Sequence, residues 1–295
     1  MLILQFTFFR AIGLCRSVNR FIVTHLSPTT SLLRSSSSDN ELYLLGTAHV
    51  SEASIQEVVD LIRLVKPDVV FLELDTSRAA QLRNRNDPGN GGGTDLSSFD
   101  LTKYMERNPL FNGILKKLPN SPLNQSLEKL LPAIPSFIDR LGWLPPQGSE
   151  MKAAMLEADR IGARCVYGDI EFSETTNMLK STALGMMSSP ASMMKTISNV
   201  PSPPPELKTL FSELIGGQDP QQLIEDIKTR ERSKMMTSYL SKCFPLIYDV
   251  MITKRDIHMA KQLKTYCSTG KVVAVVGVAH VEGIEREWET LDNVK

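Results

Sequence analysis

Two histidines occur in the same local sequence near opposite ends of the chain. His49 ends Gly-Thr-Ala-His (residues 46–49) and His280 ends Gly-Val-Ala-His (residues 277–280), and each motif follows an apolar run. A glutamate, Glu73, lies inside a third apolar run. An ionised carboxylate in such surroundings is costly unless it is paired or bound to a metal. Two imidazoles and one carboxylate also form a suitable ligand set for a divalent cation that keeps a water molecule.

These three residues suit more than one kind of site. Zn²⁺, Mn²⁺ or Co²⁺ held by His49, Glu73 and His280 would lower the pKa of a bound water molecule and polarise a carbonyl group. A metal-free site is the second interpretation, in which His49 is a general base that Glu73 orients. The third is structural, with Glu73 capping a backbone group or pairing with Arg78. The spacing does not itself define a metal site as it does in HExxH, so convergence depends on the fold.

The elements around these residues predict an α/β fold. Strand-length apolar runs are expected to form strands at residues 42–45, 69–74, 164–167 and 272–276. Apolar residues at helical spacing predict helices at about 55–65, 150–161, 246–267 and 281–291. Strand, helix and strand in succession over residues 42–74 predict a βαβ unit with parallel strands. We therefore expect a mostly parallel central sheet flanked by helices, with a helical insertion or cap in the middle of the chain.

This architecture would bring the candidate residues to one edge of the sheet. Ligands of open parallel sheets bind just beyond the carboxyl ends of the strands. Both histidine motifs follow strands directly, and Glu73 lies near the end of another. The glycine of each motif permits a sharp exit from the strand. The helix that follows presents its positive N-terminal end to an anion.

Three further residues are candidates for binding a substrate. Arg78 follows the strand that contains the glutamate and can bind a carboxylate with two hydrogen bonds, although an exposed surface arginine is equally expected. Glu150 begins a predicted helix, where a carboxylate also interacts favourably with the helix dipole. Asp169 follows a predicted strand, at a position that suits a site or a helix cap. Arg255 and Asp256 are also candidates of this second rank, and their simplest interpretation is a solvated or paired helix face.

The N-terminal residues differ in composition from the rest of the chain. The first 38 contain four arginines, no lysine and no acidic residue, and they end in four serines. Apolar, Arg-rich, Ser-rich and acid-free segments are typical of organellar transit peptides. Residues 1–40 are therefore predicted to be a transit peptide or a disordered leader, for the mitochondrion rather than the chloroplast. We expect removal of the first 38 residues to leave folding intact, with residues 41–295 forming the α/β domain.

Composition excludes several other classes. The chain has 33 basic and 33 acidic residues, so no basic excess points to nucleic acid. Its four cysteines lack CxxC spacing, which argues against a disulfide framework. No apolar run reaches the roughly 20 residues that span a bilayer, so no transmembrane span is expected. Residues of about 96–148 and 175–245 contain many prolines and methionines, and are expected to form the helical insertion.

In combination, the motifs resemble the TraB/PrgY family. Residues 45–51 and 67–74, followed by Arg78, are similar to the beginning of a TraB domain. Arg255 and Asp256, followed by residues 272–284, are similar to its end, so the resemblance spans about residues 42–288. This family is grouped with the Tiki-type proteases, the GumN-like proteins and, more distantly, the erythromycin esterase-like and ChaN-like proteins.

The resemblance implies a metal-dependent hydrolase, in one form a peptidase, that acts on a peptide or a small molecule. It implies a site of His49, Glu73 and His280, and it matches Glu150 to a glutamate at the start of the family's middle helix. The family also includes bacterial members with a pheromone-shutdown role and members that act in membrane contact at organelle outer membranes. The alternative function is therefore a non-enzymatic adaptor or regulatory protein that retains the hydrolase fold, with an organelle-membrane protein as its partner.

Overall fold

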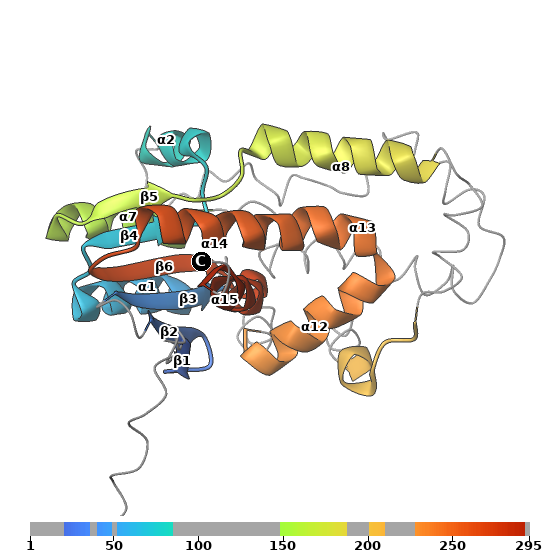
Figure 1. The fold of residues 1–295 in the computed structure, drawn as a ribbon, viewed down its shortest axis with the longest axis horizontal. Helices are drawn as coiled ribbons and strands as arrows, with labels where there is room; N and C mark the ends of the chain where they lie inside the picture. The colour runs from blue at the N-terminus through green and yellow to red at the C-terminus, as the bar shows by residue number, and fades with distance from the viewer. Residues whose placement is uncertain are drawn as a thin grey trace, which may run out of the picture.

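The centre of the fold is a six-stranded sheet (Figure 1). The computed structural model describes residues 21–35, 40–48, 52–84, 148–187, 201–209 and 228–292. In spatial order the strands are β1 (Phe21–His25), β2 (Thr30–Ser35), β3 (Glu41–Thr47), β6 (Lys271–Gly277), β4 (Val69–Leu72) and β5 (Arg164–Tyr167). The four strands from β3 to β5 run parallel, whereas β1 and β2 pair antiparallel with each other and with β3. The predicted α/β class with a mostly parallel sheet is confirmed.

Helices cover both faces of the sheet (Figure 1). On one face pack α1 (Glu52–Val65), α2 (Thr76–Asn84) and α7 (Ser149–Ile161), and on the other α14 (Lys254–Tyr266) and α15 (Val278–Asp292). Successive residues of β6 point alternately into the two cores, Val273 and Val275 into one and Val272 and Ala274 into the other. Burial on both faces explains why these strands are continuous apolar runs rather than alternating patterns.

The remaining described helices lie at the end of the sheet where β6 leads into α15. They are α8 (Phe172–Met187), a short helical segment at 205–209, α12 (Arg230–Cys243) and α13 (Pro245–Tyr248), and a π-helical turn, η1 (Asp249–Thr253), joins α13 to α14. The predicted insertion at 96–148 lies almost entirely outside the described residues, while the described parts of 175–245 are largely helical. Among the helices that the structure describes, none is long and apolar enough to cross a membrane.

The strand order differs from the simplest reading of a βαβ unit. β3 and β4 are parallel, as expected, but β6 lies between them and pairs with both. Every residue of β6 after Lys271 is buried, so this strand suits a central position with helices on both sides. The C-terminal helix also begins at Val278, earlier than the predicted residue 281, which places His280 within its first turn.

The folded part of the chain begins earlier than the boundary predicted near residue 40. Residues 21–35 form the β1–β2 hairpin, and β2 pairs with β3 along its length. Leu32 and Leu33 in β2 are buried, Leu33 with 1% of its surface exposed. Two consecutive leucines between Ser31 and Arg34 are too short a run to stand out from an apolar, Ser-rich and Arg-rich leader, so composition alone concealed this strand. Targeting to the mitochondrion stays a prediction.

The contribution of β2 to stability can be measured with two leucine variants. Leu33→Ala is expected to lower the free energy of unfolding by about 2–5 kcal/mol, because it opens a cavity in the core. Leu64→Ala in α1 is the matched control, and because 81% of Leu64 is exposed its effect should stay within roughly 0.5 kcal/mol. Urea titration measures both changes. A negligible effect of Leu33→Ala would show that β2 is not part of the cooperative fold.

Candidate functional site

The carboxyl ends of β3, β6 and β4 meet at one edge of the sheet. Thr47, the last residue of β3, lies in register with Gly277, the last residue of β6. Glu73 directly follows β4, and its backbone N–H donates to the carbonyl of Val275 at 3.1 Å. Its side chain turns toward the end of β6, where Oε2 accepts the N–H of Gly277 at 2.6 Å. The structure thus joins the predicted glutamate to the start of the second histidine motif.

His280 lies against this glutamate and is completely buried. Its Nδ1 is 2.6 Å from Oδ1 of Asp256, which α14 contributes. Its Nε2 lies 3.3 Å from Oε1 of Glu73, and within the described part of the chain this nitrogen has no hydrogen-bond partner. Both side chains have 0% exposure. One imidazole therefore sits between two carboxylates, with one ring nitrogen engaged and the other facing Glu73.

Arg255 links the glutamate to the neighbouring strand end. This side chain is 3% exposed, and its Nη2 donates to Oε1 of Glu73. The same guanidinium donates to both oxygens of Asp169, from Nε at 3.0 Å and from Nη2 at 2.8 Å. Since Asp169 follows β5, one arginine from α14 connects the ends of two strands.

The environment shifts the protonation of these groups. Burial by itself would lower the pKa of His280, but the negative charges of Glu73 and Asp256 raise it to about 9. Burial raises the pKa of Asp256 to about 6, against the opposing effect of His280. Burial would also raise the pKa of Asp169, but the charge and hydrogen bonds of Arg255 hold it below its usual value. His280 and Arg255 therefore carry positive charge in this site, next to the acidic side chains of Glu73, Asp169 and Asp256.

Asp169 and Arg78 form ion pairs within the protein. Besides the two bonds from Arg255, Asp169 accepts the N–H of Ile170 at 2.8 Å and a bond from Nη2 of Arg78 at 2.6 Å. These donors use the four acceptor positions of the carboxylate. Arg78 also pairs through Nε with Asp75. In the structure Asp169 and Arg78 contact each other, and Asp169 also contacts Arg255, while their predicted role in binding a substrate stays a prediction.

Glu150 reaches the same edge of the sheet from α7. This carboxylate is 1% exposed and accepts hydrogen bonds from the hydroxyls of Thr47 at 3.4 Å and Ser149 at 3.3 Å. The one proton of the Thr47 hydroxyl is shared with the carbonyl of Val276 at 3.3 Å, so the third predicted substrate-binding residue adjoins the end of β6. His49 lies outside the described residues, although β3, which leads to it, is described up to Thr47.

Sequence reasoning underestimated Arg255 and Asp256, which it interpreted as a solvated or paired helix face. They are 3% and 1% exposed, so they belong to the buried cluster. Their spacing carried the signal, because Arg255 lies four residues after Met251 and four before Met259, and both methionines are buried. Residues four apart share one face of a helix. A charged residue on the same helix face as two apolar residues therefore indicated that it is buried and paired with other charges.

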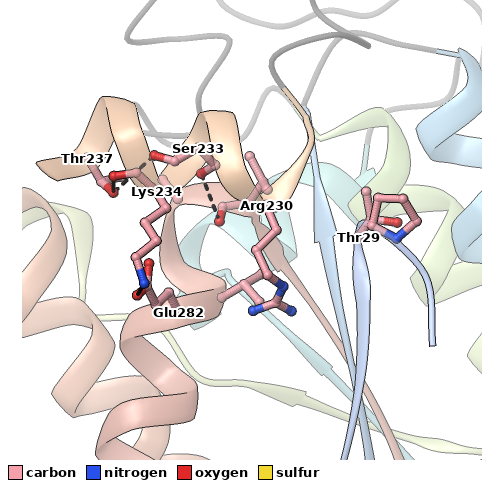
Figure 2. A pocket seen from close by; sticks show the side chains of 10 residues that line it. Thr29, Arg230, Ser233, Lys234, Thr237 and Glu282 are labelled. Carbon is pink, nitrogen blue, oxygen red and sulfur yellow. Dashed lines mark hydrogen bonds and ion pairs between the residues drawn. The ribbon is translucent and has the colours of Figure 1, made fainter. Parts of the chain in front are cut away.

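Three cavities among the described residues are not lined by Glu73 or His280. A cavity of about 10 Å³ lies beside the first turn of α15, lined by α12, α15 and the loop between β1 and β2 (Figure 2). It has room for about one water molecule. Two wider pockets, of about 450 and 500 Å³, adjoin α8 and α1. Glu73 and His280 line none of the three, and no three His, Cys, Asp or Glu side chains among the described residues are arranged to hold a metal ion.

Comparison with known proteins gives one consistent group of relatives. A sequence profile of the TraB/PrgY/gumN family matches residues 31–94 and 149–294, which include Glu73 and His280. An uncharacterised protein of Methanocaldococcus jannaschii is 28% identical over 257 residues, covering 86% of this chain and 54% of that protein. The TraB domain-containing proteins of Homo sapiens and Mus musculus are each 24% identical, covering 87% of this chain and 65% of theirs. The chain spans less than two thirds of the length of these relatives.

Replacing Arg255 by an uncharged residue should destabilise the fold. Arg255→Met is expected to lower the free energy of unfolding by about 3–5 kcal/mol, because it leaves Glu73 and Asp169 without their shared counter-charge in a buried site. Lys254→Met is the matched control, since that neighbouring cation is 47% exposed and should contribute within roughly 0.5 kcal/mol. Denaturant titration compares the two. Equal effects would contradict the role given to Arg255.

The charge on His280 predicts how stability depends on pH. In the unfolded chain the imidazole loses its proton near pH 6.5, whereas in the folded protein it keeps the proton up to about pH 9. Protonation therefore stabilises the fold fully below pH 6.5, and this contribution is lost as the pH rises through 9.

This dependence can be isolated by comparing the wild type with His280→Gln in the presence of a chelator. The free energy of unfolding of the wild type should fall more steeply between pH 6.5 and 9 than that of the variant. Urea titrations at several pH values give both slopes. Parallel slopes would mean that His280 is not charged in the folded protein.

Proposed function

The chain belongs to the TraB/PrgY/gumN family, and on that premise we propose that it is a metal-dependent hydrolase with a peptide or small-molecule substrate. The proposed ligands of the metal are His280, Glu73 and His49. Of these, His280 and Glu73 are adjacent in the structure, and His49 is included on the evidence of its sequence motif.

The observation that carries this proposal is the environment of the His280 ring. Its Nδ1 contacts a carboxylate at 2.6 Å, while its Nε2 is buried and has no hydrogen-bond partner among the described residues. A buried polar atom without a partner is unfavourable unless something else satisfies it. Histidines that bind metals almost always donate their other ring N–H to a carboxylate or a carbonyl group. The ring is therefore held as a metal-ligating histidine is held.

Glu73 is oriented to serve as a second ligand. The N–H of Gly277 and the guanidinium of Arg255 hold its carboxylate, and Oε1 lies 3.3 Å from Nε2 of His280. A bound Zn²⁺, Mn²⁺ or Co²⁺ would supply an activated water molecule and polarise the bond to be cleaved. Arg255 balances the negative charge of Glu73 and Asp169, and this lowers the cost of keeping the carboxylates ionised in a dry site.

A specific observation also favours the non-enzymatic alternative. His280 and Glu73 have no exposed surface, and Glu73 already has a buried cationic partner in Arg255. This arrangement also suits an ionic cluster that only stabilises an inherited fold. An adaptor or regulatory protein at an organelle membrane is therefore the second candidate function, and metal analysis separates it from the first.

Metal content should depend on the buried histidine. The purified wild type is expected to contain about one Zn²⁺, Mn²⁺ or Co²⁺ per chain, as is usual for a three-ligand site. His280→Ala and Glu73→Gln should lose it, because each removes a ligand. His258→Ala is the matched control, since His258 is a half-buried histidine of α14 whose ring has no hydrogen bond to His280 or Glu73 within the described residues and interacts with Asp169 only through its charge.

Elemental analysis measures the metal, and hydrolysis of a mixed peptide library with and without a chelator measures activity. Chelator-sensitive cleavage that His280→Ala abolishes and His258→Ala preserves would support the hydrolase. A metal-free wild type whose fold survives chelation, with no cleavage after each metal is added, would overturn it and favour the adaptor.

A further inference from the structure

We infer that Asp256 is a positioning residue that fixes the tautomer of His280, so that Nδ1 carries the proton and Nε2 presents its lone pair to a ligand. The role of Asp256 in a reaction rests on the proposed function, whereas its effect on the tautomer does not. The sequence analysis interpreted this aspartate most simply as part of a solvated or paired helix face. Its assignment comes from the packing of α14 against α15.

The first observation is the contact itself. Oδ1 of Asp256 lies 2.6 Å from Nδ1 of His280, within the short range of charge-assisted hydrogen bonds. The two side chains are 1% and 0% exposed, so water does not compete for the bond. An ionised carboxylate can only accept, which requires the proton of this bond to be on Nδ1. In the neutral ring Nε2 is then unprotonated.

The second observation is the space that α15 leaves for the carboxylate. Gly283 lies three residues after His280, on the same face of the helix. A Cβ atom on Gly283 would lie 1.8 Å from Oδ2 of Asp256 and 2.4 Å from its Cγ. Any larger residue would therefore displace the carboxylate. A glycine inside a helix is unfavourable relative to alanine, and here it leaves the space in which the Asp256 carboxylate contacts the His280 ring.

The third observation is the direction of the other ring nitrogen. Nε2 faces Oε1 of Glu73 at 3.3 Å and has no hydrogen-bond partner among the described residues. If the neutral ring carried its proton on Nε2 instead, Asp256 would have to be protonated to keep its contact with Nδ1. An aspartate is ordinarily ionised at the pH where the ring is neutral, and it can then only accept from Nδ1. The arrangement thus favours one tautomer over the other.

The tautomer can be measured directly in the full chain without a substrate. Metal-free protein labelled with ¹⁵N-histidine is studied by long-range ¹H–¹⁵N correlation NMR at a pH where the ring is neutral. His280→Gln identifies the signals of His280 among the four histidines. We expect the pattern of a ring protonated on Nδ1. A wild-type ring protonated on Nε2 would overturn the inference, and this measurement needs no variant that alters the cluster.

Three variants test the cause of that preference. Asp256→Asn replaces the carboxylate by an amide that can also donate, and should convert the signal to a mixture or to the opposite tautomer. Gly283→Ala keeps the charge but displaces it, and should change the signal in the same direction. Glu282→Gln is the matched control, because that carboxylate is on the same turn but is 43% exposed and pairs with Lys234. Unchanged tautomers in both Asp256→Asn and Gly283→Ala would contradict the inference.

Metal affinity provides a separate readout. If the proposed site binds Zn²⁺, Asp256→Asn should weaken binding about 10–100-fold, the usual effect of losing a carboxylate behind a histidine ligand. Glu282→Gln should leave the affinity unchanged. Loss of affinity without a change of tautomer would refute tautomer control by Asp256. Absence of Zn²⁺ binding by the wild type would count against the proposed function alone, and the NMR result would still decide the role of Asp256.

Discussion

The buried ion pair of Arg255 with Glu73 and Asp169 is the contact on which the rest of this edge of the sheet depends. It joins α14 to the residues that follow β4 and β5, and the side chain of Arg255 is 3% exposed. Buried charges are favourable only when their partners are complete, and here the guanidinium meets carboxylates on two sides. The same arginine therefore fixes the orientation of Glu73, and Glu73 in turn defines the surroundings of His280.

The order of the strands brings Gly277 and His280 beside Glu73. β6 lies between β3 and β4, so the residues after β6 emerge beside Glu73 rather than at a sheet margin. The backbone of Gly277 then donates directly to Glu73, and His280 follows within the first turn of α15. Segments from both ends of the chain meet at one point because parallel strands share a carboxyl edge.

The shifted pKa of His280 follows from the burial of the cluster. Charges on Glu73, Asp256 and Arg255 act on His280 without screening by water, and the two carboxylates outweigh the effect of burial on its pKa. Such perturbed groups at a strand edge are characteristic of functional sites, and they also occur in structural ion networks. What distinguishes this cluster is Nε2 of His280, a buried nitrogen whose partner is absent from the described residues.

Much of the fold could be predicted from the sequence, because its signals are local. Apolar runs marked β3, β4, β5 and β6, and α7 ends at the predicted residue 161, where Gly162 follows in the left-handed conformation with a φ of 74°. The hairpin of β1 and β2 was missed, since its short apolar runs, residues 21–23 and 32–33, lie in a segment whose overall composition resembles that of a leader. The helix over 246–267 was found, but not the π-helical turn of residues 249–253 inside it.

By itself, the sequence determined the residue types at the site: strand-end glycines, Glu73 and His280 were identifiable because each stands out against its apolar neighbours. Only the tertiary structure decided their partners. Three features join residues far apart in the chain: β6 is central in the sheet, Arg255 pairs with two carboxylates, and Asp256 packs against Gly283. Spacing along a single chain carries no information on such contacts, because they depend on which elements pack together.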